Sequence, residues 1–289
     1  MNLKELLEKE NFKFEKKYGQ NFISDTNLLM SIVNDCQITK DEQVLEIGPG
    51  AGTLTKEIAK QSKCVISYEI DTNLENILKQ SLQDVSNSKI IFKDFMQTNE
   101  DEIIKEFNNF SNELNLKSGE QFSVIANLPY YITTPIIFKL LDFNGVDTIA
   151  IMVQKEVAER IVAKKGKDYG ILSIMIDFFA NAKITRIVNR QMFTPAPNVD
   201  SAIVFIQIEK DKYPNCSKEL FSKIVHTAFS MRRKTLANNL MNGLNLTRDE
   251  VENLLGEQRK NLRAETLCTQ DFVNLTIDYE NFLKKQYKK

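Results

Sequence analysis

Residues 45–53 read Leu-Glu-Ile-Gly-Pro-Gly-Ala-Gly-Thr, an apolar run that enters a glycine-rich turn and continues into a helical pattern. Glycine is required where a chain turns sharply and lets a ligand approach more closely than a Cβ would permit. Glu69 ends the next apolar run, 19 residues after Gly50, and an acid at that distance can accept both hydroxyls of a ribose. The spacing predicts a nucleoside-containing cofactor at Gly48, Gly50 and Glu69. A turn without a ligand is the alternative, and the motif alone fits a dinucleotide or another adenosine cofactor.

Two further acids favour a cofactor other than a dinucleotide. Glu46 directly precedes the turn, where a carboxylate would repel a pyrophosphate but tolerate a cationic sulfonium that also carries an ammonium group. Asp94 ends the third predicted strand, where it offers an acceptor to an adenine amino group. An ordinary cap of the following helix explains Asp94 equally well.

Asn127 opens a second motif, Asn-Leu-Pro-Tyr-Tyr, directly after the apolar run 122–126. The exocyclic nitrogen of adenine is a poor nucleophile because its lone pair is delocalised into the ring. The Asn127 side-chain oxygen and the Leu128 carbonyl can accept its two N–H bonds and favour a pyramidal nitrogen that faces a methyl donor. Pro129 stiffens the turn that aims both acceptors, and Tyr130 offers a face for a base taken out of its helix. The motif predicts methyl transfer to an adenine amino group without a strong general base, against the alternative of an ordinary loop.

Phe193 begins a stiff, proline-rich stretch, residues 193–201, that we expect at the same edge of the sheet. An aromatic ring at this loop tip could sandwich the target base opposite Tyr130, with core packing as the alternative. Arg232, Arg233 and Lys234 form a basic cluster at a predicted helix junction. The chain carries a net charge of −1, yet from Lys210 to the end 15 basic residues face 10 acidic ones. This asymmetry favours contacts with nucleic-acid phosphates over merely solvated charge.

The composition excludes several other classes of protein. With 289 residues, 42% apolar and 27% charged, the chain is typical of a soluble globular protein of about two domains. No apolar run approaches the roughly 20 residues of a membrane helix, and the charged start lacks the apolar centre of a signal peptide. His226 is the single histidine, which excludes multi-imidazole metal sites, and the four scattered cysteines indicate free thiols. We therefore expect a cytoplasmic monomer without metal or membrane.

Short apolar runs alternate with helical patterns through the first two thirds of the chain, which is typical of a parallel sheet with right-handed crossovers. We predict a seven-stranded, mostly parallel α/β sheet, closed by an antiparallel pair, and a small all-α domain after it. The predicted domains are an N-terminal arm (1–25), a methyltransferase domain (26–210) and a helical RNA-binding domain (211–289). The polar segment 108–120 is predicted to be a surface loop. The strands are expected at 43–47, 64–70, 89–93, 122–126, 148–153, 184–188 and 202–208. The helices are expected at 26–36, 54–61, 73–82, 100–107, 135–141, 220–229, 234–241, 248–255 and 272–284.

Together the motifs resemble the ribosomal RNA adenine dimethyltransferase family, class I methyltransferases with a Rossmann-like sheet that use S-adenosyl-L-methionine. The resemblance spans nearly the whole chain, from Gly-Gln-Asn-Phe at residues 19–22 to residues 228–240. The chain is most similar to the bacterial small-subunit branch, because of its Asn-Leu-Pro-Tyr form, its Val-Asp-Ser-Ala after the proline-rich loop and its Arg-Arg-Lys-Thr-Leu-x-Asn-Asn-Leu. The segment 108–120 is longer than is usual in the family.

The resemblance implies N6,N6-dimethylation of two adjacent adenosines in the 3′-terminal hairpin of 16S rRNA during ribosome biogenesis. It implies a base pocket formed by residues 127–130 with Phe193. Three alternatives stay open: a large-subunit (23S) rRNA adenine methyltransferase of the resistance type, a nicotinamide-dependent oxidoreductase, and an assembly factor whose methyl transfer is secondary. The cofactor contacts that the resemblance implies are Asn21, Ile23, Gly48, Glu69, Asp94 and Asn127.

Overall fold

The computed structural model describes residues 3–15, 19–166, 168–231, 233–259 and 261–286. The chain divides into two compact units, one of Met1–Ala158 with Ala182–Ile208 and the other of Glu159–Asn181 with Glu209–Lys289. The division into domains 1–25, 26–210 and 211–289 stays a prediction. Within the described residues, no helix has the length and apolar character to cross a bilayer.

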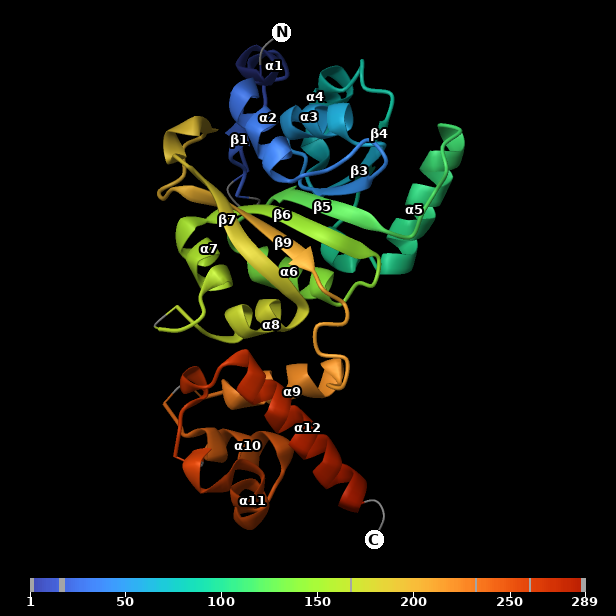
Figure 1. The fold of residues 1–289 in the computed structure, drawn as a ribbon. Coiled ribbons are helices and arrows are strands. Elements are labelled where there is room, and N and C mark those ends of the chain that lie inside the picture. Colours follow the sequence, from blue (N-terminus) through green and yellow to red (C-terminus); the bar gives the residue numbers. More distant parts are fainter. Residues whose placement is uncertain (1–2, 16–18, 167, 232, 260, 287–289) are drawn as a thin grey trace. The chain divides into compact units, whose positions relative to one another are not determined.

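A seven-stranded sheet forms the centre of the first unit, in the strand order β4-β3-β2-β5-β6-β9-β7 (Figure 1). The paired strands from β4 to β6 are parallel, and β9 runs antiparallel to β6. This confirms the predicted α/β fold. The strands are β2 (Gln43–Ile47), β3 (Cys64–Glu69), β4 (Ser88–Phe92), β5 (Phe122–Asn127), β6 (Val146–Gln154), β7 (Ala180–Val188) and β9 (Ser201–Ile208).

A separate two-stranded sheet joins two segments that are far apart in the chain. β1 (Phe22–Ile23) pairs antiparallel with β8 (Phe193–Thr194), so that Ile23 lies opposite Phe193. This pairing ties the start of the chain to the proline-rich segment.

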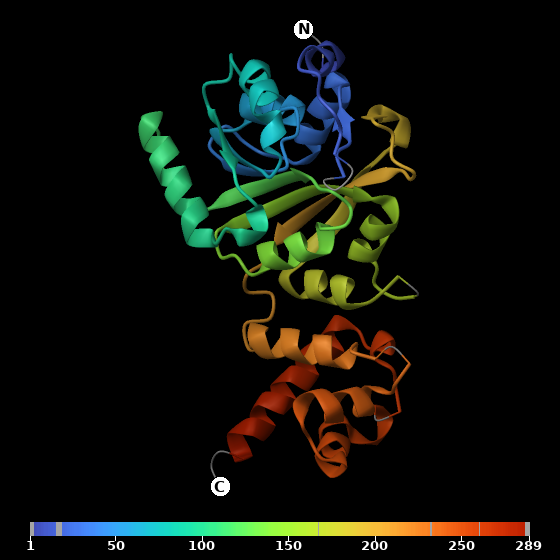
Figure 2. The ribbon, with the colours of Figure 1, turned by 180° about the vertical axis from the view of Figure 1, so that it is seen from behind.

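Helices cover both faces of the large sheet, as the pattern of a buried parallel sheet requires. In Figures 1 and 2, α2, α3 and α4 lie on one face and α5 and α6 on the other. One core cluster joins α2 and α3 to the sheet through side chains such as Ile32, Ile58 and Ile125. A second cluster packs Leu6 and Leu7 of the N-terminal helix against α4. The helices are α1 (Leu3–Lys9), α2 (Thr26–Asp35), α3 (Thr53–Gln61), α4 (Glu75–Ser81), α5 (Glu100–Glu113), α6 (Thr133–Leu141) and α7 (Lys155–Val162).

One local prediction is wrong, several element boundaries differ from the predicted ones by a few residues, and three α-helices have no counterpart among the predictions. The segment 108–120 is not all loop, because α5 continues to Glu113 and buries Phe110 on the same face as Phe107. The next helix begins at Thr133, two residues before the predicted start. The three additional helices are α1, α7 and α8 (Ile171–Phe179).

The second unit is helical. Within it α9 packs against α8, α10 and α12, and α10 packs against α11. The rings of Phe178 and Phe221 stack with centroids 3.8 Å apart, which fixes α8 on α9. Its further helices are α9 (Lys218–Ala228), α10 (Leu236–Leu244), α11 (Arg248–Arg259) and α12 (Thr269–Gln286).

Candidate cofactor- and base-binding site

A pocket opens where the strand order reverses, at the carboxyl ends of β2 and β5. The chain builds β2, β3 and β4 in one direction from this point and then returns to place β5 on the other side of β2. Open α/β sheets bind their ligands at such a switch point. The lining includes residues 19–23, the glycine turn, Glu69, Asp94 and residues 127–132.

The glycine turn cannot be built from other residues. Gly48 and Gly50 have φ angles of 74° and 56°, in the left-handed region that only glycine adopts readily. A Cβ on Gly50 would also lie 2.8 Å from the Phe22 ring. The turn is fixed by a hydrogen bond from the Gly48 amide to the Tyr68 carbonyl, at 3.0 Å. Glycine at position 50 thus makes room for the Phe22 ring, and both Gly48 and Gly50 line the pocket.

Glu69 ends β3 with its carboxylate held by backbone donors. Oε2 accepts from the Gly50 amide at 3.1 Å, and Oε1 accepts from the Asp71 amide at 2.9 Å. The side chain is buried, and desolvation raises its pKa to about 7, against the opposing effect of the backbone hydrogen bonds. A carboxylate with both oxygens fixed beside the glycine turn is suited to accept two hydroxyl hydrogens.

Glu46 does not line the pocket, contrary to the role expected for it beside a cationic cofactor. Alternation along β2 turns its side chain away, and Oε2 accepts from Thr55 Oγ1 and Ser67 Oγ, each at 2.7 Å. The other oxygen is buried without a hydrogen-bond partner among the described residues. Burial raises the Glu46 pKa to about 7. Glu46 is therefore not placed to repel a pyrophosphate by direct contact.

Asp94 caps the short helix that follows it, as the alternative interpretation expects, and it also lines the pocket. Its Oδ1 accepts from the Met96 amide at 2.9 Å, at the start of the short helix Phe95–Gln97. Its Oδ2 accepts a longer bond of 3.3 Å from Gln97 Nε2. A cap that faces the pocket is still able to accept a further hydrogen from a ligand.

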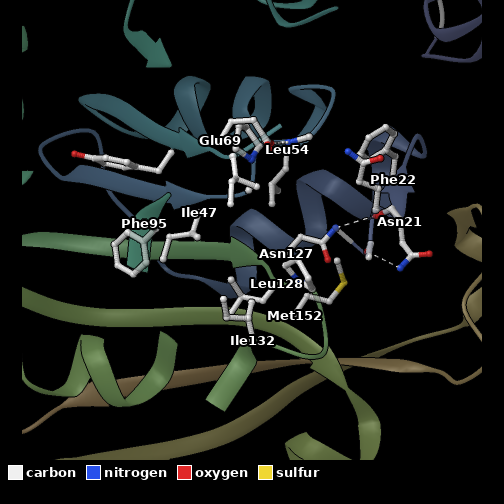
Figure 3. A pocket seen from close by; sticks show the side chains of 18 of the residues that line it. Asn21, Phe22, Ile47, Leu54, Glu69, Phe95, Asn127, Leu128, Ile132 and Met152 are labelled. Atoms are coloured by element: carbon white, nitrogen blue, oxygen red, sulfur yellow. Dashed lines mark hydrogen bonds between the residues drawn. The ribbon is translucent and has the colours of Figure 1, made fainter. Parts of the chain in front are cut away.

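Asn127, the last residue of β5, is oriented by the N-terminal segment. Its Nδ2 donates to the Asn21 carbonyl at 3.1 Å, and Asn21 in turn donates from Nδ2 to the Gly19 carbonyl at 3.0 Å. Both bonds are drawn as dashed lines in Figure 3. Because the amide nitrogen is engaged, Oδ1 is the end of the carboxamide that remains to accept a hydrogen from a ligand.

The residues after Asn127 differ in how firmly they are held. Leu128 is buried, and the Tyr130 hydroxyl lies 2.9 Å from Ser201 Oγ. Desolvation raises the Tyr130 pKa, so the phenol stays neutral near pH 7. Tyr131 is 64% exposed although it lines the pocket. Pro129 and Tyr131 both face Gly19, whose added Cβ would lie 3.3 Å from the proline Cβ.

Phe193 is placed differently from the exposed loop-tip ring that the sequence predicts. It is 5% exposed and packs in the core cluster with Ile23, Leu29 and Ile32. The cause is the pairing of β8 with β1, which turns the ring inward. The described residues that line the pocket do not include it. Its part in a base pocket stays a prediction.

The predicted basic cluster lies in the second unit. Arg233 and Lys234 are exposed, between α9 and α10. Arg232 lies outside the described residues. Among the described residues, no group of His, Cys, Asp or Glu side chains is arranged to hold a metal ion.

Sequence reasoning missed several residues of the pocket. Phe22 packs over Gly50, and Met152 of β6 lines the pocket near Asn127 (Figure 3). An apolar side chain in a pocket carries the same signal as one in the core, so no pattern distinguishes the two. Gln20 also lines the pocket and does carry a signal, since it precedes Asn21 in the motif Gly-Gln-Asn-Phe.

The strand order, the antiparallel β9 between β6 and β7, and the glycine turn at the switch point define the class I methyltransferase fold. The sequence model of the family described as ribosomal RNA adenine dimethylase matches residues 11–285. The chain belongs to this family, whose members use S-adenosylmethionine.

Two curated relatives agree with this assignment. The chain is 41% identical over 275 residues to the ribosomal RNA small subunit methyltransferase A of Clostridioides difficile, covering 93% of this chain and 92% of the relative. It is 40% identical over 281 residues to the protein of the same name from Bacillus mycoides, covering 94% of each chain.

Two crystal structures share the fold. A dimethyladenosine transferase from Plasmodium falciparum superposes with a TM-score of 0.73 at 23% identity, covering 90% of this chain and 98% of the other. The 23S rRNA methyltransferase ErmE superposes with a TM-score of 0.64 at 24% identity, covering 90% of this chain and all of the other.

Proposed function

We propose that this protein transfers methyl groups from S-adenosylmethionine to the N6 atoms of two adjacent adenosines in the 3′-terminal hairpin of 16S rRNA. The fixed orientation of Asn127 supports this most directly, because its Oδ1 is the end of the amide that can accept from an adenine amino group. The small-subunit enzymes that resemble the chain over nine tenths of its length support the choice of rRNA.

The residues at the switch point fit the cofactor. The Glu69 carboxylate is positioned for the ribose hydroxyls and Asp94 for the adenine amino group, and Gly48 and Gly50 of the turn line the same pocket. Asn21 and Ile23 line the same pocket, and the Asn21 carbonyl accepts from Asn127 Nδ2. S-adenosylmethionine supplies a methyl group on a cationic sulfur.

The base side of the pocket prepares the adenine nitrogen. Asn127 Oδ1 and the Leu128 carbonyl accept its two hydrogens, which localises the lone pair toward the methyl group. The Tyr130 ring, anchored by Ser201, offers a stacking face. Bound S-adenosylmethionine would supply the methyl group to this nitrogen, and the methylated, cationic nitrogen would be acidic enough to lose its proton to water. Two transfers to each adenosine require that the space beside Asn127 accept a methylamino group as well as an amino group.

The decisive experiment offers labelled S-adenosylmethionine with unmethylated small and large ribosomal subunits and then maps the labelled base. We expect label in two adjacent adenosines of the 16S 3′ hairpin, each dimethylated. Label confined to 23S rRNA would replace the proposal with the large-subunit alternative. No label with either subunit, together with affinity for NAD instead of S-adenosylmethionine, would favour the oxidoreductase.

A separate experiment tests whether the protein is an assembly factor for which methyl transfer is secondary. The Asn127→Ala variant should bind small-subunit particles as the wild type does while it no longer methylates them. If this variant supports particle assembly at the wild-type rate, the main role of the protein is in assembly and methyl transfer is secondary.

A further inference from the structure

Asp71 is a buried carboxylate that the proposed chemistry does not use. It is 1% exposed, and its Oδ1 accepts from the Asn73 amide at 3.1 Å and from Asn73 Nδ2 at 2.9 Å. Its backbone amide donates to Glu69 Oε1 at 2.9 Å. Asp71 therefore sits directly behind the carboxylate that we assign to the ribose.

Gln20 supplies the remaining partner of Asp71 and uses both ends of its amide. Nε2 donates to Asp71 Oδ2 at 2.5 Å, and Oε1 accepts from the Glu15 backbone amide at 2.9 Å. These bonds connect the N-terminal segment to the loop after β3, across 51 positions of sequence. Gln20 also lines the pocket.

The next residue along the chain holds the other half of the site. The Asn21 carbonyl accepts from Asn127 Nδ2, so the segment 20–21 contacts both the support of Glu69 and the carboxamide of Asn127. A shift of this segment would change the ribose acceptor and the base acceptor together.

We propose that Gln20 and Asp71 are positioning residues that form a latch. The latch holds residues 19–23 against the pocket and thereby orients Glu69 and Asn127 for the cofactor and the base. This inference rests on the proposed function, since it assigns the latch to that same cofactor and base. Neither residue is placed on the reacting atoms, and both act through Glu69 and Asn127.

The hydrogen-bond polarity of the latch allows a reversal test in the full-length protein. In Asp71→Asn, the new amide nitrogen faces Gln20 Nε2, so two donors oppose each other. In Gln20→Glu, two carboxylates oppose each other. In the double variant, the new carboxylate at position 20 accepts from the new amide at position 71 and from the Glu15 amide. The amide oxygen at position 71 still accepts from Asn73, so every bond of the latch is remade, with donor and acceptor exchanged between its two members.

We expect each single variant to raise the Kd for S-adenosylmethionine about tenfold, the effect of one unsatisfied buried polar group. The double variant should return to within about threefold of the wild type. Hydrogen exchange of residues 19–23 without ligand should be faster in the single variants and restored in the double variant. At saturating cofactor, kcat should fall in the single variants as well, because the support of Asn127 is displaced.

Gln80→Ala is the matched control. Gln80 also bridges to the N-terminal segment, accepting from Lys9 Nζ at 2.8 Å and donating to Glu10 Oε1 at 2.7 Å, but it does not line the pocket. Its Kd and kcat should stay within twofold of the wild type. If Gln20 and Asp71 formed only a structural bridge, Gln80→Ala would change Kd and kcat as much as Gln20→Glu and Asp71→Asn do.

The outcomes distinguish a failure of the latch from a failure of the proposed function. A wild type that does not bind S-adenosylmethionine overturns the proposed function, and the hydrogen-exchange cycle then decides the latch alone. A wild type that binds, with single variants that bind equally well or a double variant that is not restored, overturns the latch and leaves the proposed function standing.

Discussion

Two acidic side chains, Glu69 and Asp94, line the cofactor side of the pocket, and backbone amides hold both of them. Glu69 accepts from two amides, and Asp94 accepts from one. On the base side, Asn127 donates to one backbone carbonyl, that of Asn21, and the Tyr130 hydroxyl pairs with the side chain of Ser201. Tyr131 is largely exposed, and Phe193 packs in the core.

This difference indicates that the two halves are prepared to different degrees. The donors to Glu69 and Asp94 are main-chain amides of the glycine turn, of the loop after β3 and of the short helix Phe95–Gln97, so the main chain positions both carboxylates. The base side has a fixed hydrogen-bond acceptor, but only one of its aromatic rings is anchored. The remaining contacts with the base therefore have to form when the nucleotide binds. Substitutions on the base side should therefore affect catalysis and rRNA recognition, whereas those on the cofactor side should affect cofactor affinity.

The largest expected effect is that of Asn127→Ala. Removal of a positioned acceptor from the reacting group should lower kcat at least about a hundredfold. The Kd for S-adenosylmethionine should rise only a few-fold, because Glu69 and the glycine turn remain. Calorimetry and methyl transfer at saturating cofactor measure the two quantities.

Asn112→Ala, at an exposed position of α5, is the control and should match the wild type. Wild-type turnover by Asn127→Ala would remove the assigned role of the carboxamide. If the Kd for S-adenosylmethionine rises by the same factor as kcat falls, the inference that the two sides of the pocket serve catalysis and cofactor affinity separately is wrong.

The second unit extends the comparison to rRNA binding. Neutralising Arg232, Arg233 and Lys234 together should weaken binding of the rRNA hairpin more than tenfold at low salt. It should also flatten the dependence of log K on log salt by up to about 0.9 for each phosphate that is no longer neutralised. Filter binding across a salt series measures both, and neutralisation of the exposed Lys4 in α1 is the control. An unchanged slope would mean that the cluster is solvated charge.

The sequence is sufficient to predict the fold and the glycine turn, for a physical reason. Parallel strands buried on both faces give clear apolar runs, and the predicted range of β2 matches the observed one at both ends. The need for positive φ restricts the turn to glycine at Gly48 and Gly50, so the motif is visible without any contact being known.

The sequence is less informative where long-range pairing decides the geometry. The placement of Phe193 follows from β8 meeting β1, and these strands are two residues long, which is too short for any periodicity. The position of Glu46 in the chain predicts a place at the pocket, but the alternation of β2 turns it toward Thr55 and Ser67. The helical extension to Glu113 is hidden by a polar, asparagine-rich composition.

The cofactor side should show its own pH dependence. Burial raises the pKa of Glu69 to about 7, and ribose hydroxyls can both donate only to the ionised carboxylate. Cofactor binding should therefore lower this pKa, and affinity should fall as the pH drops through about 7. We expect a Kd about tenfold weaker at pH 6 than at pH 8, measured by calorimetry.

Glu69→Gln should bind weakly with a nearly flat pH profile, since the titrating group is gone. Glu46→Gln should keep the wild-type slope, because Glu46, which titrates in the same range, does not line the pocket. A slope that disappears in the Glu46 variant instead would assign the pH dependence to Glu46 and remove it from Glu69.

The smallest expected effect concerns the exposed ring of Tyr131. It tests whether a base-side residue affects rRNA binding without affecting cofactor affinity. If Tyr131 stacks on the nucleotide next to the target adenosine, Tyr131→Ala should raise the KM for the rRNA hairpin about fivefold, at the low end of base-stacking energies. Tyr131→Phe keeps the face and should stay within twofold. Neither variant should change the Kd for S-adenosylmethionine, and an equal loss in both would show that the hydroxyl, rather than the ring, contacts the substrate.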